Sequence, residues 1–467
     1  MKGDDAVSQT LEWLDLNLAP LDKDVDFLWR NRPDVHKRQP VNPQLFGRHD
    51  EWTIVSNARG FRSVEPPLPD KPAGEFRILC IGDSVTFGFN VDQADSYPER
   101  LQATLRARYP DRPIRVINAG TPGWSWLQGL RFLEREGVAL RPDVVVMGHG
   151  ANDRYFPATI TDAERFGVLQ RPGVRWMESA RLLLERSSTY RLVQRFAPRS
   201  DDSKDLSPGC RRQVAETGKC GRVGLDEIEA SVAAAKRLAG AVGADLVVLN
   251  VDFEETDAVT AVRKAVDGSS IPYLDIVSEY VERRTADERA RERRLGLAAT
   301  RLRPAAAWQP PVTTRVLFRV LAPPGGSSVR VDGVSVMTKK QFGTELRDDG
   351  TAGDEIAGDG VWSGRIVIAA DQWEYRYSRD GTAELLPLPP LPSTQQNRKR
   401  SMWGETILPV EVFGDLYLKA ERMHPNAEGQ QMIADGVLEI LPTLQSFASW
   451  LNADRMRTVE RRGTGEQ

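Results

Sequence analysis

The sequence predicts an α/β protein whose main unit is a doubly wound parallel sheet, with a small all-β sandwich inserted in the chain. From Phe76 to about residue 275, strand-like apolar runs alternate with segments of helical periodicity. Those runs are apolar on both faces, which is typical of a parallel sheet covered by helices on each side. Between about 312 and 386 the pattern changes to short runs divided by Gly, Asp and Pro turns, as in a sandwich.

The elements of the α/β unit follow one another in a regular order. The predicted strands share an apolar run and lie at 76–82, 114–120, 142–150, 245–252 and 270–277. Helices are predicted between strands, near 97–108, 127–136 and 225–241. The last helix shows the spacing most clearly, because apolar residues recur every three or four positions at Leu225, Ile228, Val232, Ala235 and Leu238.

These patterns divide the chain into four expected segments. They are an irregular N-terminal segment with a Pro-rich exit (1–73), the first part of the α/β unit (74–300), the inserted sandwich (301–390) and the return to the α/β unit (391–467). The return ends in an amphipathic helix, which is marked by Ile433, Val437, Ile440 and Leu441.

Composition and charge exclude several functional classes. Lys and Arg number 63 and Asp and Glu number 66, so the net charge of −3 gives no electrostatic reason to expect nucleic-acid binding. No apolar run approaches the ~18 residues that span a bilayer, so we expect no transmembrane segment in this chain. The acidic, mixed N-terminus does not have the pattern of a secretory signal.

The three cysteines bear on the cellular compartment. Cys80 lies in an apolar run and is expected in the core, whereas Cys210 and Cys220 bracket a polar loop. The pair is either a disulfide, contributing about 2–3 kcal/mol to stability, or two free thiols. If the two are linked, the protein works in an oxidising compartment, and its leader or anchor lies outside this chain.

Small and polar residues follow the predicted strands where a site is expected. In open α/β sheets, sites form beyond the carboxyl ends of the strands. Ser84 follows the first strand, Gly120 closes the second and Asn152 follows the third, while His424 precedes the last helix. A serine activated by a histidine base, with backbone N–H groups and an amide to bind an oxyanion, is equipped for acyl transfer.

Four blocks carry a resemblance to a known family. GDS, NAG, GAND and ERMH resemble, in this order, the blocks of the SGNH (GDSL-type) hydrolases, over about 76–275 and 405–445. The resemblance implies that Ser84 is the nucleophile, that Gly120 and Asn152 complete the oxyanion hole, and that His424 is the base. The phrase VSNARGFRS also resembles segments that precede the GDS block in exported or membrane-tethered bacterial members.

The last block departs from the family pattern. The family has Asp three residues before the histidine, and this chain has Glu421. Glu421 reaches one methylene further and is the expected orienting acid for His424. The alternatives are Asp415, a backbone carbonyl that orients the ring, or a bystander Glu421 exposed to solvent.

Aromatic and acidic residues outside the four blocks have two interpretations each. His149, Trp124 and Trp126 either line the substrate site or belong to the core. The inserted unit resembles an early-set or carbohydrate-binding-module sandwich. Its aromatic residues either stack on sugars or fill the core; they are Trp362, Trp373, Tyr375 and Tyr377. The acidic run from Asp348 to Asp359 does not match an EF-hand loop, which favours a Gly/Asp-rich turn over a calcium site.

Together these features predict a serine esterase that removes short acyl groups, acetyl in the first place, from a carbohydrate or another polar substrate. We expect no metal or cofactor. One alternative is an O-acyltransferase that uses the same residues, with a sugar hydroxyl replacing water. The other is a non-catalytic carbohydrate-binding or scaffold protein, if the change at Glu421 has abolished activity.

Overall fold

The computed structural model describes most of the chain. The described residues are 21–40, 51–64, 70–154, 158–185, 205–250, 256–276, 313–322, 327–351, 353–354, 356–358, 360–369, 371–383, 398–402, 406–407, 411–412, 424–425 and 427–453. The chain forms two compact units, one of Met1–Val277 with Met423–Gln467 and one of Ser278–Arg422.

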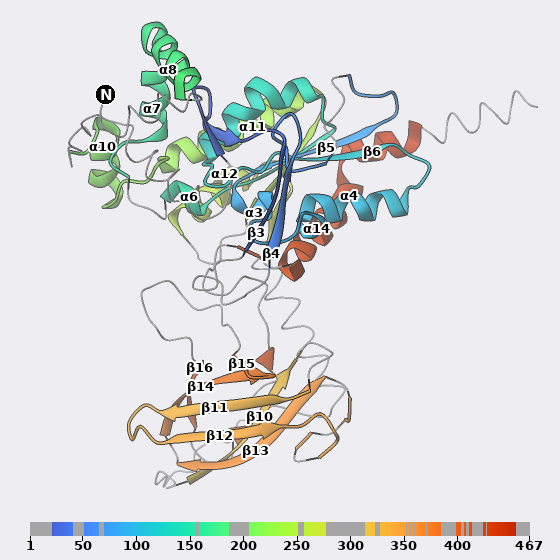
Figure 1. Cartoon of the computed structure of the whole chain (residues 1–467), viewed down its shortest axis with the longest axis vertical. Helices are drawn as coiled ribbons and strands as arrows, with labels where there is room; N and C mark the ends of the chain where they lie inside the picture. Colours follow the sequence, from blue (N-terminus) through green and yellow to red (C-terminus); the bar gives the residue numbers. More distant parts are fainter. Residues whose placement is uncertain are drawn as a thin grey trace, which may run out of the picture. The chain divides into compact units, whose positions relative to one another are not determined.

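The first unit is built on a five-stranded parallel sheet (Figure 1). Its strands, in spatial order, are β6 (Ile114–Asn118), β5 (Phe76–Gly82), β7 (Val144–Gly148), β8 (Asp245–Asn250) and β9 (Tyr273–Asp275). Every neighbouring pair is parallel, and all residues of β5 and β7 are buried. The predicted α/β fold class is confirmed.

Helices cover both faces of this sheet. Ile78 and Cys80 of β5 face one cluster, formed with α4 (Tyr97–Arg108) and the C-terminal helix α14 (Ala427–Ile440). Leu79 and Ile81 face the other, formed with α5 (Trp126–Phe132), α11 (Leu225–Ala241) and α12 (Asp257–Val266). Alternate residues of strand β5 therefore pack into two separate cores. Helix α14, which follows the inserted segment in the sequence, belongs to the first unit.

The described part of the N-terminal segment contains regular strands, whereas the sequence predicted an irregular segment over 1–73. It forms two antiparallel hairpins, one from β1 (Leu21–Asp24) and β2 (Leu28–Asn31), the other from β3 (Val35–Pro40) and β4 (Glu51–Ser56). Strands β1 and β2, with four residues each, are too short for a clear periodicity, and a hairpin of this size depends on packing against the rest of the unit. Trp29 and Trp52 are each 1% exposed, and Trp29 lies in the core of the first unit.

The second unit consists of two β-sheets. One contains β10 (Thr313–Leu321), β13 (Val361–Ala369), β17 (Thr406–Ile407) and β18 (Glu411–Val412). The other contains β11 (Val329–Ser335), β12 (Gln341–Leu346), β14 (Asp371–Arg379), β15 (Thr382–Ala383) and β16 (Arg398–Met402). These sheets extend beyond the predicted range of 301–390, because strands β16–β18 follow that range in the sequence.

The aromatic residues of strand β14 are core residues. Trp373, Tyr375 and Tyr377 alternate along it and are at most 2% exposed. The two tyrosines pack against Phe318 and Trp373 packs against Phe342, while the partly buried Trp362 lies against the same core. The interpretation of these side chains as a sugar-stacking surface is therefore wrong for the three on β14, because alternate residues of a strand share one face and this face is the buried one.

The acidic run of the second unit forms a turn as far as it is described. Asp354 Oδ2 accepts a hydrogen bond from the Gly350 N–H at 2.6 Å, and Asp348 Oδ2 accepts one from the Gly360 N–H at 3.0 Å. Glu355 and Asp359 lie outside the described residues. Carboxylates that accept backbone N–H groups in this way stabilise the turn, which agrees with the Gly/Asp-rich turn.

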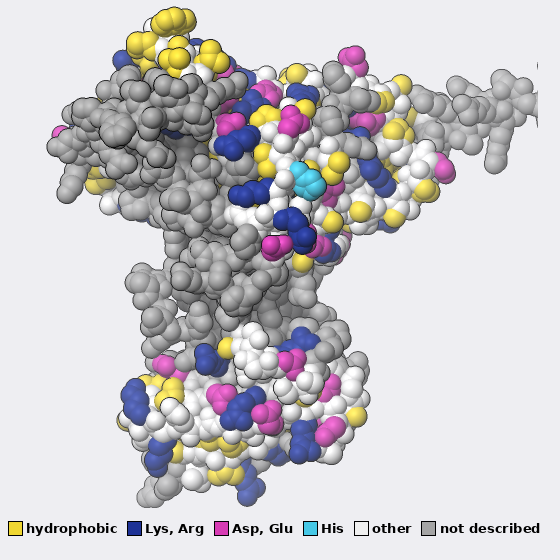
Figure 2. Space-filling model, viewed as in Figure 1, with side chains coloured by type: hydrophobic (Ala, Val, Ile, Leu, Met, Phe, Trp, Pro, Cys, Tyr) yellow, Lys and Arg dark blue, Asp and Glu magenta, His cyan; other side chains and the backbone are white. Residues whose placement is uncertain are grey.

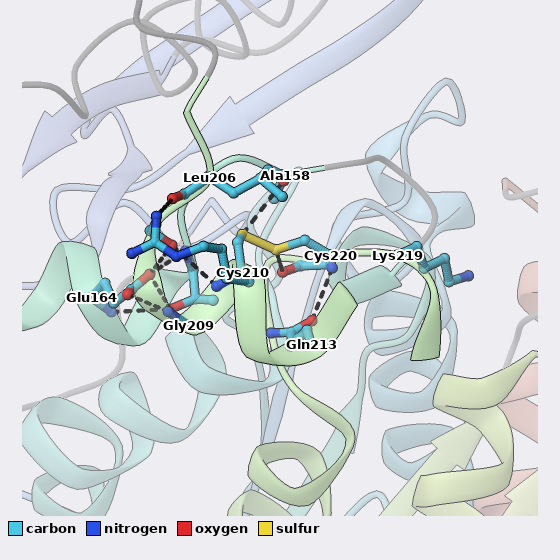
Figure 3. The surroundings of a disulfide bond; sticks show 12 residues. Ala158, Glu164, Leu206, Gly209, Cys210, Gln213, Lys219 and Cys220 are labelled. Atoms are coloured by element: carbon cyan, nitrogen blue, oxygen red, sulfur yellow. Dashed lines mark hydrogen bonds between the residues drawn. A yellow bond between two sulfur atoms is a disulfide. The ribbon is translucent and has the colours of Figure 1, made fainter. Parts of the chain in front are cut away.

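Cys210 and Cys220 form a disulfide in the first unit (Figure 3). Cys210 lies on α10 (Pro208–Thr217), whose N-cap Ser207 accepts the Cys210 N–H at 3.1 Å. The Gly221 N–H, next to Cys220, donates to Gln213 Oε1 of the same helix at 3.0 Å. Of the two interpretations of this cysteine pair, the structure has the disulfide.

None of the helices within the described ranges is both long and apolar enough to cross a bilayer.

Candidate active site

Ser84 stands on a tight turn between strand β5 and the one-turn helix α3 (Ser84–Phe87). A Cβ on Gly82 would lie 2.0 Å from Thr86 Oγ1 and 2.7 Å from the Gly148 carbonyl oxygen, so only glycine fits there. Asp83 caps the helix, and its Oδ1 accepts the Val85 N–H at 2.9 Å. This turn holds the half-buried Ser84 at the carboxyl edge of the sheet.

His424 meets Ser84 although 340 residues separate them in sequence. Its Nε2 lies 2.7 Å from Ser84 Oγ, and its ring packs on Phe89 with the ring centroids 4.7 Å apart. Gln430 of helix α14 explains the placement. Its Nε2 donates to the Val85 carbonyl of α3 at 3.0 Å, and its Oε1 accepts the Tyr97 N–H at 2.7 Å. The structure therefore brings the predicted nucleophile and base into hydrogen-bond contact.

Gly120 lies directly against the nucleophile helix. A Cβ at this position would lie 2.2 Å from the Phe87 nitrogen, so the close approach of the two backbones requires glycine. The Gly120 N–H donates to Asn118 Oδ1 at 3.0 Å. The predicted oxyanion donor thus lies against helix α3 and donates to a protein acceptor in this structure.

Asn152 lies on the short helix α6 (Ala151–Arg154), which follows β7. Its Nδ2 donates to Asp83 Oδ2 at 3.1 Å and to the Trp124 carbonyl at 3.3 Å. The Asn152 amide therefore joins the first and third sequence blocks. A substrate oxyanion, which is a stronger acceptor than a neutral carbonyl, would have to displace Trp124 to use this donor.

Asp83 connects the parts of this site. It is 4% exposed, and burial raises its pKa to about 6, against the opposing effects of the Val85 N–H, His424 and Asn152. Its two oxygens accept hydrogen bonds from the helix it caps and from the oxyanion candidate. The carboxyl thus titrates close to neutral pH at the centre of the site.

Replacing Asp83 by Asn is expected to change the pH dependence of stability. A carboxyl whose pKa is higher in the folded than in the unfolded chain lowers the free energy of unfolding as the pH rises from about 4 to about 6. The amide does not titrate. Apart from a constant offset for the altered contact with Asn152, Asp83→Asn should gain about 2–3 kcal/mol relative to wild type between pH 4 and 7. Denaturant unfolding at each pH measures this, and a pH-independent difference would contradict the raised pKa.

Glu421 and Asp415 are the two acids that the sequence offers to orient His424. Glu421 and Asp415 both lie outside the described residues. His149 is described and belongs to the core, since it is 4% exposed and its ring lies 5.3 Å from that of Trp126. Burial lowers the pKa of His149 to about 3, so its ring is neutral at pH values near 7. Asp153 braces the same region, because its Oδ1 accepts the Trp126 N–H at 2.9 Å.

Trp124 and Trp126 are core residues. They are 2% and 0% exposed, and Trp124 Nε1 donates to the Trp29 carbonyl at 2.9 Å. Trp176 on helix α8 (Pro172–Glu185) is the opposite case at 73% exposed, and Figure 2 shows the apolar side chains of α8 on the surface. Of the two interpretations of Trp124 and Trp126, the structure therefore has the core one.

A serine hydroxyl in contact with a histidine, at the carboxyl edge of a doubly wound sheet, is the arrangement of a serine hydrolase. Residues 80–307 match the model of the GDSL-like Lipase/Acylhydrolase family. These residues are similar to that family of ester-hydrolysing serine enzymes, while His424 lies beyond the matched region. Within the described ranges, no group of three or more His, Cys, Asp or Glu side chains is arranged to hold a metal ion.

Solved structures share low identity with the chain, and no curated protein matches it. LAE5, an alpha/beta hydrolase enzyme from the metagenome of Lake Arreo, is 15% identical, with 44% of this chain and 81% of LAE5 covered and a TM-score of 0.27. Axe2, an acetylxylan esterase from Geobacillus stearothermophilus, is 16% identical over 44% and 78%, with a TM-score of 0.25. The lipase/acylhydrolase from Enterococcus faecalis is 15% identical over 44% and 77%, with a TM-score of 0.25.

Proposed function

We propose that this protein hydrolyses short-chain esters, with acetyl esters as the preferred substrates, through an acyl-enzyme on Ser84. The observation that carries the proposal is the 2.7 Å distance between Ser84 Oγ and His424 Nε2. A serine hydroxyl is a weak nucleophile until a base removes its proton, and this distance is within the range for direct proton transfer.

The reaction follows from these two groups. His424 Nε2 takes the Ser84 proton while Oγ bonds to the acyl carbon, and the imidazolium then gives that proton to the leaving alcohol oxygen. The acyl group remains as an ester of Ser84. A water molecule attacks this ester, with His424 again accepting the proton and returning it to Ser84 Oγ, and the carboxylic acid leaves.

Two groups beside Ser84 are proposed to stabilise the tetrahedral oxyanion. They are the Gly120 N–H and the Asn152 amide, with the Ser84 N–H as a third donor. Because Asn118 and Trp124 accept hydrogen bonds from the first two in the absence of substrate, the developing negative charge has to compete with neutral acceptors. A charged oxygen forms the stronger bonds, so this competition favours the transition state over the neutral ester.

The short acyl chain is part of the proposal that the test below decides. Trp124 and Trp126, the aromatic residues that follow the second block, lie in the core. The alcohol part of the ester is proposed to be a carbohydrate, because the inserted unit resembles an early-set or carbohydrate-binding-module sandwich. The buried aromatic residues of the second unit, Trp373, Tyr375 and Tyr377, add no support to it.

Turnover by the purified protein tests this proposal. Aryl esters whose acyl chains have from two to about twelve carbons should be compared with acetylated glycans as substrates. The Ser84→Ala variant is the control. We expect the acetyl ester to have the highest kcat/KM and free acetate to be the product. Acetyl transfer to an added sugar in place of release would instead indicate an acyltransferase, and no turnover of any ester by wild type would contradict the proposal.

Glu421 is proposed to orient His424 and to stabilise its cation. The substitution Glu421→Gln removes the charge and should lower kcat by less than the about 10⁴-fold seen for the acid of a serine-protease triad, because a carbonyl can still hold the ring. Glu421→Asp should also lower kcat, since the shorter side chain falls short of a ring placed for glutamate. Both are measured as kcat over a range of pH, and an unchanged profile in both variants would make Glu421 a bystander.

A further inference from the structure

Arg62 lies upstream of the region that matches the family and reaches the nucleophile helix from there. It belongs to the segment VSNARGFRS, whose first two residues end strand β4, and its side chain is 0% exposed. Its own N–H donates to the Asn118 carbonyl at 3.0 Å, two residues before Gly120. Arg62 therefore contacts the second block through its backbone and the end of helix α3 through its side chain.

The two terminal nitrogens of the Arg62 guanidinium donate only to backbone carbonyls, while its buried Nε has no hydrogen-bond partner among the described residues. Its Nη1 donates to the carbonyls of Phe87 and Gly88, the latter at 2.6 Å. Its Nη2 donates to Val91 at 2.7 Å and to Thr53 at 3.1 Å. The cation also lies 4.7 Å from the centroid of the Phe87 ring. Burial lowers its pKa to about 9, so it is charged at neutral pH.

Helix α3 needs such external contacts to keep its shape. It has four residues, and a single helical turn is unstable by itself because its few hydrogen bonds do not offset the cost of nucleation. Its last carbonyls also have no partners within the helix. Asp83 holds its start and Gln430 its middle, and Arg62 holds its end at Phe87 and Gly88.

We infer that Arg62 is a positioning residue for Ser84, which fixes the end of α3 and thereby the place of Ser84 Oγ relative to His424 Nε2. The inference rests on the proposed role of Ser84 as nucleophile. Gly88 fits the same picture, since it ends the helix at a φ of +77° and a Cβ there would lie 2.5 Å from Arg62 Nη1. Arginine suits this place because its planar fork meets several acceptors at once, which the single ammonium of lysine does not.

A second buried arginine, near the start of strand β5 and so at the opposite end of that strand from Ser84, supplies the control. Arg77, near the start of β5, is also 0% exposed, and it donates to Glu75 Oε1 and to the Leu140 carbonyl, both at 2.6 Å. Arg62→Met and Arg77→Met both remove a buried cation and its hydrogen bonds, to backbone carbonyls for Arg62 and to the Glu75 carboxylate and the Leu140 carbonyl for Arg77. Only the first should change the position of Ser84.

The test compares the rate at which a fluorophosphonate labels Ser84 in folded wild type, Arg62→Met, Arg62→Lys and Arg77→Met, together with Tm, kcat and KM for an aryl acetate. We expect Arg62→Met to lose about 10²-fold in labelling rate and in kcat with little change in KM, because small misplacements of reacting groups cost about this much. Arg62→Lys should fall between it and wild type. Arg77→Met should lower Tm and label at close to the wild-type rate.

Equal labelling rates in Arg62→Met, Arg77→Met and wild type would overturn the role of Arg62, whatever the loss in Tm. If Arg62→Met does not fold, Arg62→Lys decides in the same way, a wild-type labelling rate contradicting the inference and a reduced one supporting it. A wild-type protein that neither labels nor turns over any ester would overturn the proposed function itself, and the role of Arg62 with it.

Discussion

Ser84→Ala is expected to reduce kcat for an aryl acetate by about 10⁵–10⁶-fold, the scale on which a serine hydrolase loses activity without its nucleophile. The reason is the contact between Ser84 Oγ and His424 Nε2, since the alanine variant has no oxygen for the histidine to activate. Steady-state turnover with purified protein measures the loss. Because Ser84 is half-buried and at the edge of the sheet, Tm should change little.

His424→Ala and the double variant complete this experiment. Groups that act as one unit lose their effect together, so the double variant should be about as slow as either single one. Multiplied losses would mean that the two residues act separately. Activity retained in Ser84→Ala would remove Ser84 from the mechanism.

Asn152→Ala is expected to lower kcat by about 10²–10³-fold, the cost of removing one oxyanion donor. KM should change little, because the donor acts on charge that develops only in the transition state. Asn250 is a matched control at the end of the neighbouring strand β8, where its Nδ2 donates to Asp275 Oδ1 at 3.1 Å. Asn250→Ala should keep kcat within about twofold, as expected of a residue outside the chemistry. An unchanged kcat with a raised KM in Asn152→Ala would show that Asn152 only binds substrate.

The sequence was sufficient for the parallel sheet because the information is local. The central strands β5, β7 and β8 contain apolar runs of four or more residues, and the period of helix 225–241 is continuous. The N-terminal hairpins could not be found in the same way. Strands β1 and β2 have four residues each, and they are stabilised by Trp29 packing on a core formed by residues far along the chain. The alternation along β14 was visible, but it does not say which face is buried.

The candidate site was predictable only in part, for a similar reason. Ser84, Gly120, Asn152 and His424 stand in short blocks with recognisable spacing, so they could be named from the sequence. Arg62 and Gln430 could not, because their importance lies in contacts with backbone carbonyls that the sequence does not reveal. The acceptors on Gly120 and Asn152 were also unexpected, since a hydrogen bond to Asn118 or to Trp124 depends on how the loops fold.

The central claim is that His424 activates Ser84, and the most direct measurement is the site of covalent reaction with a fluorophosphonate. Such a probe bonds to an activated serine oxygen with loss of fluoride, so peptide mass spectrometry shows which residue carries it. The account predicts one adduct per molecule, on Ser84, and none on the His424→Ala variant under the same conditions. A wild-type protein that takes up no probe, or takes it up on another residue, would contradict the account.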